Sequence, residues 1–111
     1  MDKKNVIFVI SGRCGCELEE PKLTKTQKDA DEWVRRKIAE LVIEDFSMDL
    51  KEVGIIPEDT ALVYDKGFNL KSEYIEPVLE WGIEHEYCTD NTYQYCCDWT
   101  EYTVTMLKIP A

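Results

Sequence analysis

The sequence predicts an α+β domain with a roughly four-stranded antiparallel or mixed sheet, one long helix packed on one face, and a C-terminal β-hairpin. Three observations lead to this prediction. A continuous apolar run at residues 6–10 is typical of a buried strand. Apolar residues recur every three or four positions over residues 24–46, which indicates an amphipathic helix. Apolar and polar residues alternate over residues 79–87 and again over 93–99, which is the pattern of half-buried strands.

The length and hydropathy of the chain bound its organisation. A chain of 111 residues is long enough for one domain and too short for two, so residues 1–111 are expected to form a single compact unit. No stretch approaches the roughly 20 apolar residues of a membrane span. The N-terminal apolar run is also shorter than that of a signal peptide, about 7 to 15 residues. We therefore expect a cytoplasmic protein in a reducing compartment, where disulfides are disfavoured.

The N-terminal half is expected to contain a strand and the principal helix. Residues 5–10 predict the strand, and the glycine-containing segment 11–16 predicts a loop. The helix can begin at Thr24 or Thr26, since both residues suit an N-cap. Residues 47–53 predict a short second helix that starts at a serine and stops at a glycine. The buried face of the long helix is expected to comprise Trp33, Val34, Ile38, Leu41 and Val42.

The C-terminal half is expected to be mainly strands. Residues 61–64 predict a short strand and residues 65–67 a tight turn. Residues 68–77 favour no one element, because Pro77 would interrupt a helix there. A three-residue turn at 89–91 then joins the two alternating segments and places their aromatic side chains on one face, since a slip by one residue would invert a strand. The opposite face of this hairpin is expected to carry Glu80, Glu84, Glu86 and Asp98.

The charge is strongly negative and unevenly distributed. The formal net charge is −10. Residues 1–55 contain 12 acidic and 10 basic residues, whereas residues 56–111 contain 11 acidic and 3 basic residues. Between Lys71 and Lys108 there is no lysine or arginine. Such a charge repels nucleic acid and anionic membranes and attracts basic partners.

We therefore interpret Glu80, Glu84, Glu86 and Asp98 as a partner-binding patch of a small non-enzymatic binding or inhibitor protein. The expected partner is a basic protein surface, for example that of a nuclease or another nucleic-acid-binding protein, whose groove the carboxylates would occupy as a nucleic-acid mimic. In size and acidity, but in no sequence motif, the chain is similar to small proteins of bacteriophages and mobile elements that block host defence nucleases.

The five cysteines provide an alternative interpretation as a small zinc-binding module. The candidate ligands are Cys14, Cys16 and Cys88, with either Cys96 or Cys97. The paired CxxC spacings of zinc sites are absent. Cys96 and Cys97 are adjacent in an expected strand and so point to opposite faces. We therefore predict that no metal or other cofactor is bound, and that the cysteines are small buried residues and surface thiols.

A small enzyme is the third interpretation. His85 is the one histidine of the chain, and Cys97 on the neighbouring expected strand could approach it as a nucleophile. A lone histidine among tyrosines is more commonly a packed core residue, which is our prediction for His85. The carboxylates show no spacing that is specific to acid–base catalysis. We therefore predict no catalytic residues.

Overall fold

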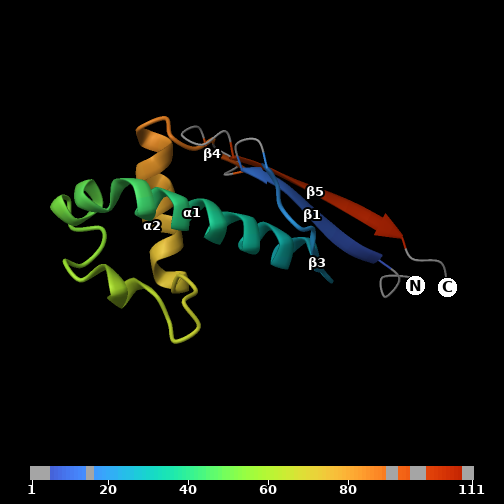
Figure 1. The fold of residues 1–111 in the computed structure, drawn as a ribbon, viewed down its shortest axis with the longest axis horizontal. Helices are drawn as coiled ribbons and strands as arrows, with labels where there is room; N and C mark the ends of the chain where they lie inside the picture. The colour runs from blue at the N-terminus through green and yellow to red at the C-terminus, as the bar shows by residue number, and fades with distance from the viewer. Residues whose placement is uncertain (1–5, 15–16, 90–92, 96–99, 109–111) are drawn as a thin grey trace.

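A computed structural model describes residues 6–14, 17–89, 93–95 and 100–108 and confirms the predicted α+β class (Figure 1). The molecule measures 52 × 29 × 22 Å, with a helical half at one end and a sheet arm at the other. No helix among the described residues combines the length and hydropathy that crossing a bilayer requires. The described elements are β1 (Val6–Cys14), β2 (Glu17–Leu18), β3 (Lys22–Thr24), α1 (Gln27–Glu52), a 3-10 helix (Thr60–Val63), α2 (Ser72–Glu84), β4 (Gln94–Tyr95) and β5 (Thr100–Lys108).

The sheet is antiparallel and is built around the long pair β1–β5. The strand order is β2-β1-β5-β4, and β3 also pairs with β1. The β1–β5 ladder runs from the pair Val6–Lys108 to the pair Arg13–Glu101. Because β5 occupies one edge of β1, both β2 and β3 lie along the other edge. With these partners, β1 extends to Cys14, which is four residues beyond the predicted end of the strand at residue 10. Part of the segment predicted to be a loop is therefore strand.

The long helix lies where the apolar periodicity predicted it, with two differences. Of the two candidate N-caps, Thr26 is the one used, because its hydroxyl accepts from the backbone N–H of Asp29. The helix continues to Glu52, but Phe46 has non-helical angles (φ −126°, ψ 27°), so the expected second helix is the part of α1 beyond this kink. Trp33 and Leu41 pack against the core without being fully buried. The buried residues of α1 are Ala30, Val34, Ile38, Ala39, Val42, Ile43 and Leu50.

The strand predicted at residues 79–87 is wrong, because these residues belong to α2 and the loop that follows it. Residues 75, 78, 79 and 82 are buried at helical spacing. Burying three apolar side chains stabilises the helix by roughly 1.5 to 3 kcal/mol each, which outweighs the roughly 3 kcal/mol that Pro77 costs inside it. The helix ends in a Schellman motif. There Glu86 adopts φ 62° and the N–H of Tyr87 donates to the carbonyl of Gly82 at 2.8 Å.

Two further expectations in the second half are corrected. Residues 61–63 belong to the 3-10 helix and not to a strand, and Tyr64, which follows it, bridges to Leu70 around the expected turn. The left-handed residue of that turn is Phe68 (φ 63°). The C-terminal hairpin exists, but β4 and β5 form it, through the pairs Gln94–Glu101 and Tyr95–Thr100. The predicted hairpin register is therefore wrong.

The core lies between α1, α2 and the near face of the sheet. An added Cβ at Gly82 would lie 2.8 Å from Cys88 Sγ and at an ordinary contact distance, 3.5 Å, from a methyl carbon of Val42 on α1, so the missing side chain leaves room for the buried Cys88. On the sheet, Trp33 of α1 meets Tyr102 of β5 edge to face, with ring centroids 5.7 Å apart. Through these contacts, α2 packs on one part of α1, and the sheet packs along another part of the same helix (Figure 1).

Candidate functional site

The solvent side of α2 carries a row of four carboxylates. Glu73, Glu76, Glu80 and Glu84 are all exposed and follow one another at spacings of three or four residues. On a helix this spacing places them on one side, opposite the buried face of α2. The row spans about 16 Å of helix axis. We call these four residues the α2 acidic row.

The row is almost unneutralised. Glu76 forms an ion pair with Arg35 of α1. Within the described part of the chain, no other ion pair involves the row. Like charges at i,i+4 on a helix destabilise it by about 0.2 to 0.5 kcal/mol per pair. Glu80 and Glu84, which are both unpaired and four residues apart, are therefore a small cost to the fold.

The predicted patch is only partly reproduced. Glu80 and Glu84 do share a face, but it is the face of a helix and not of a strand. Glu86 is exposed and lies in the turn that ends α2. Asp98 lies outside the described residues. Sequence reasoning missed Glu73 and Glu76, although their spacing from Glu80 was a readable helical signal.

A second group of carboxylates lies on the C-terminal part of α1. Asp45 lies just before the kink at Phe46, and Asp49 and Glu52 lie beyond it; all three are exposed, and the spacing of Asp49 and Glu52 places those two on one side. The hydroxyl of Tyr95 donates to Asp45 Oδ2 at 2.5 Å. The C-terminal ends of both helices therefore present acidic side chains.

A hollow of about 210 Å³ lies between these two helix ends. Two carboxylates and three aromatic rings surround it together with one aliphatic side chain. Because aromatic faces and carboxylates both attract cations, this lining suits an ammonium or guanidinium group. The lining residues are Asp49, Glu52, Val53, Trp81, His85 and Tyr87.

His85 is part of this hollow and is not the core residue that the sequence predicted. Its side chain is exposed and stacks on Trp81, with ring centroids 4.3 Å apart. Its Nδ1 lies 2.8 Å from the carbonyl oxygen of Trp81, so Nδ1 carries the proton and donates. The predicted neighbour Cys97 lies outside the described residues, and the Cys–His pair stays a hypothesis.

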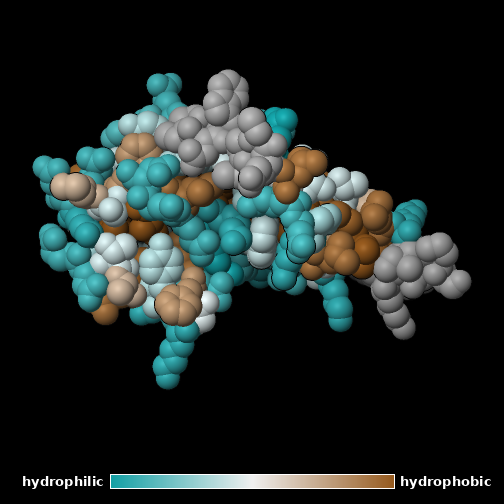
Figure 2. Space-filling model, in the orientation of Figure 1, coloured by the Kyte–Doolittle hydropathy of each residue, from teal (hydrophilic) through white to brown (hydrophobic). Residues whose placement is uncertain are grey.

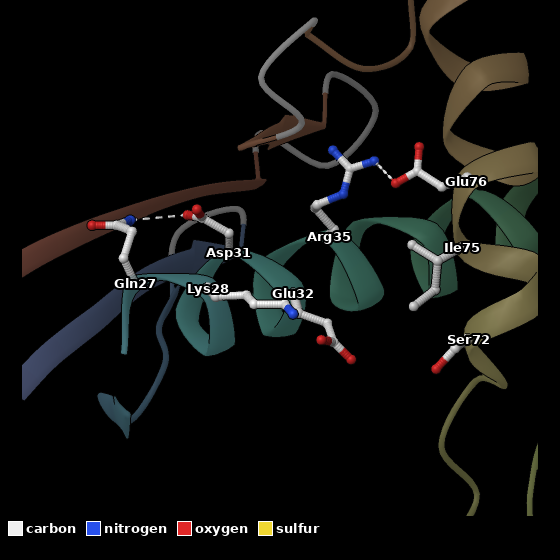
Figure 3. A pocket seen from close by; sticks show the side chains of 8 residues that line it. All are labelled: Gln27, Lys28, Asp31, Glu32, Arg35, Ser72, Ile75 and Glu76. Atoms are coloured by element: carbon white, nitrogen blue, oxygen red, sulfur yellow. Dashed lines mark hydrogen bonds and ion pairs between the residues drawn. The ribbon is translucent and has the colours of Figure 1, made fainter. Parts of the chain in front are cut away.

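A separate groove of about 720 Å³ lies between the first halves of α1 and α2 (Figure 3). Its polar groups bond to one another. Gln27 Nε2 donates to Asp31 Oδ1 at 3.0 Å, and the Arg35–Glu76 ion pair crosses from one helix to the other. In the described chain no buried side-chain nitrogen or oxygen lacks a hydrogen-bond partner. The groove is therefore a bonded helix–helix junction.

Two tyrosine hydroxyls near α1 have raised pKa values. Burial raises the pKa of Tyr93 to about 12, helped by its hydrogen bond to Asp31 and by the charge of that carboxylate. Burial also raises the pKa of Tyr64, and the nearby charges of Glu40 and Glu44 add to the shift. Both phenols are therefore neutral at physiological pH.

The cysteines are mostly beyond the described structure. Cys88 is buried, and its sulfur faces Gly82. Cys14 ends β1, while Cys16, Cys96 and Cys97 lie outside the described residues. Among the residues that the structure describes, no three His, Cys, Asp or Glu side chains come close enough to hold a metal ion.

Comparisons with known proteins give no relative for this chain. No protein-family model, no curated protein and no solved structure matches it.

Proposed function

We propose that this protein is a non-enzymatic binding protein whose α2 acidic row engages a basic surface on a protein partner. The observation that supports this proposal most directly is the alignment of four glutamates on the exposed side of one helix: Glu73, Glu76, Glu80 and Glu84. Three of these carboxylates have no ion-pair partner among the described residues. A basic partner would remove their mutual repulsion, so association relieves a cost that the free protein carries.

The spacing of the row also supports a nucleic-acid mimic. Four carboxylates over about 16 Å of helix are spaced about 5.5 Å apart, and Arg35 neutralises one of them. A DNA strand carries one phosphate per about 3.4 Å of helix axis. The row is thus a line of negative charges that is sparser than a DNA strand. We propose that the partner is a nucleic-acid-binding protein, such as a nuclease of the kind used in host defence, and that the row occupies its phosphate-binding groove.

The hollow at the helix ends gives the partner an anchoring point. Asp49 and Glu52 supply negative charge, and Trp81, His85 and Tyr87 supply ring faces. A lysine or arginine side chain of the partner that enters this hollow is partly desolvated, and there cation–π attraction is worth about 1 to 2 kcal/mol. Arginine is the better fit, because its guanidinium can stack on a ring and bind a carboxylate in two places.

We place this interaction in the reducing cytoplasm. The buried position of Cys88 is compatible with that compartment, where disulfides are disfavoured. Glu86, at the turn after α2, extends the acidic surface next to the hollow. Glu86 is less suitable than Glu80 or Glu84 for a test substitution. Its left-handed backbone is part of the Schellman motif, and a new side chain there would affect the stability of that motif.

The test is a charge reversal within the row. Glu80→Lys combined with Glu84→Lys is introduced, partners are captured from lysate at low salt, and the affinity of the captured protein is measured against ionic strength. We expect an affinity loss of at least tenfold and a shallower salt dependence, since fewer charges act across the interface. Nucleic acid should compete with the native protein for the same partner.

The matched control reverses the same amount of charge elsewhere. Glu20→Lys combined with Glu58→Lys changes two exposed carboxylates outside α2. This control should keep most of the affinity, because the net charge is equal and the row is intact. Equal losses in both double variants, or no loss in either, would show that the row is only a solubilising surface.

A further inference from the structure

The turn that precedes α2 holds an aromatic side chain in water. Phe68 is 85% exposed, a larger fraction than that of any other large hydrophobic side chain in the described residues. Its φ of 63° is left-handed, a conformation that bulky side chains rarely adopt. On the face shown in Figure 2 the helical half is mainly hydrophilic, so an exposed ring in this half is an exception. Both its exposure and its backbone conformation therefore need a reason.

The fold of the turn does not supply that reason. The carboxylate of Asp65 accepts from the backbone N–H of Gly67 at 2.8 Å and from that of Asn69 at 3.1 Å. The N–H of Phe68 donates to the carbonyl of Asp65 at 3.0 Å, and the N–H of Asp65 donates to the carbonyl of Asn69 at 2.9 Å. None of these bonds uses the phenylalanine ring. Glycine or asparagine would adopt the same left-handed conformation with less strain.

The turn is fastened to α1 and so presents the ring in a fixed place. Leu70 is buried, its N–H donates to Glu40 Oε2 at 3.2 Å, and its carbonyl accepts from Arg36 Nε at 3.2 Å. The N–H of Lys71 then donates to the carbonyl of Val63 at 2.9 Å. A group that is ordered before binding loses little entropy when it binds. The ring is thus preorganised at the N-terminal end of α2 (Figure 1).

The charge around this turn differs from that of α2. Lys66 and Lys71 flank the ring and are two of the three basic residues in 56–111. The carboxylate of Asp65 is directed at the backbone N–H groups of the turn. A basic surface would therefore meet repulsion at Phe68, whereas a neutral or acidic one would not.

We propose that Phe68 is an apolar anchor that enters an apolar pocket, with a neutral or acidic rim, on the same protein that binds the α2 acidic row. This inference rests on the proposed function. Glu73, the first residue of the row, follows Phe68 by five residues, so a partner that lies along α2 reaches the turn. Aromatic side chains that fill a pocket are typical binding hot spots. Backbone strain that does not serve the fold is also typical of functional positions.

The first experiment measures affinity against ionic strength. The protein captured through the α2 acidic row is purified and titrated with wild type and with Phe68→Asn. Affinity should fall at least tenfold at every salt concentration, with an unchanged salt slope, because the lost contact is apolar. The thermal midpoint should be unchanged or higher, since asparagine relieves the left-handed strain. Met48→Asn is the matched control: Met48 is 81% exposed on α1, and its variant should keep the affinity.

A second measurement uses a defined probe and needs no partner. β-Cyclodextrin offers an apolar cavity with a neutral hydroxyl rim, the chemistry proposed for the pocket. The chain contains three phenylalanines, and Phe8 and Phe46 pack against the core. In a proton NMR titration the ring signals of Phe68 should therefore shift, and Phe68→Asn assigns them. Absence of a shift would overturn the proposal, because the ring would not be free to enter a pocket.

The outcomes separate this inference from the proposed function. An affinity loss of less than about twofold in Phe68→Asn, beside a retained effect of the Glu80/Glu84 reversal, would refute the anchor and leave the row. A large loss in Phe68→Asn with no effect of the reversal would refute the row and leave the anchor. Capture of no protein by wild type would refute both. Binding to phosphatidylcholine vesicles, or a mass above 13.0 kDa that rises with concentration, would also overturn the pocket if Phe68→Asn abolished it, and would assign the ring to a lipid surface or a second copy.

Discussion

Gly12 illustrates how one residue changes the interpretation of a segment. Its place in a glycine-containing stretch predicted a loop, yet it lies in β1 opposite Tyr102. An added Cβ at this position would overlap the ring of Tyr102, which lies over the glycine. The ring in turn meets Trp33 edge to face. Gly12 thus leaves room for the ring of Tyr102, which contacts Trp33 of α1. Tyr102 is ninety positions away from Gly12, so no local pattern in the sequence reveals this contact.

Tyr93 and Asp31 provide a prediction at the same scale. The hydroxyl of Tyr93 donates to Asp31, and its pKa is raised to about 12 from an ordinary value of about 10. The raised pKa stabilises the fold fully below about pH 10, and this contribution is lost as the pH rises to about 12. Asp31→Asn should lower the pKa of Tyr93, because the variant removes the carboxylate charge.

Carbon NMR of the tyrosine rings measures this directly, with Tyr93→Phe to assign the signal. Asp29→Asn is the control, since Asp29 is an exposed carboxylate of the same helix. An unchanged pKa in Asp31→Asn would mean that burial alone raises it.

The two helices differ in how far the sequence predicts them. For α1, the apolar stripe extends over many turns and admits no alternative period. For α2, residues 79–87 fit both a strand and a helix, and the decision depended on whether Pro77 excluded a helix. Tertiary packing decided it, since the buried face begins before the proline, at Ile75, and continues to Gly82. The wrong assignment of a strand also affected the candidate site. Glu80 and Glu84 were predicted to lie on one face of a strand, and Glu73 and Glu76 were missed.

The stripe of α1 can be tested at its centre. Ile38 is fully buried, so Ile38→Ala should lower the free energy of unfolding by about 2 to 5 kcal/mol. Leu41→Ala should cost less, because Leu41 is only partly buried. The surface control Met48→Ala should change it by less than about 0.5 kcal/mol. Urea unfolding measures all three, and equal effects at Ile38 and Met48 would contradict the orientation of α1.

The charge of the whole molecule is unevenly divided between its two ends. Acidic residues concentrate on the helices, and the strands carry few charges. The sequence indicates the acidity and its C-terminal bias. It does not indicate the division, because the sheet joins strands from both ends of the chain. Only the three-dimensional arrangement separates the acidic surface of the helices from the weakly charged sheet.

Metal removal tests the stability of this whole arrangement. We predict that the protein folds without metal and without disulfides. The buried thiol of Cys88 contacts Gly82, and the described residues form no metal-binding group. A chelator together with a reductant should therefore leave the thermal midpoint unchanged. A large drop, or one equivalent of zinc in native mass spectrometry, would support the zinc hypothesis and direct mutagenesis to Cys14, Cys16, Cys88, Cys96 and Cys97.

The β1–β5 ladder also affects how the protein can fold during its synthesis. Translation produces β1 well before β5, at about 5 to 20 residues per second. β1 therefore waits roughly 5 to 19 s for its central partner. During that time only the β2 and β3 side of β1 can pair, and α1 and α2 can dock through contacts that are nearer in sequence. The nascent apolar strand at the start of the chain is thus the segment that a ribosome-associated chaperone has most reason to shield.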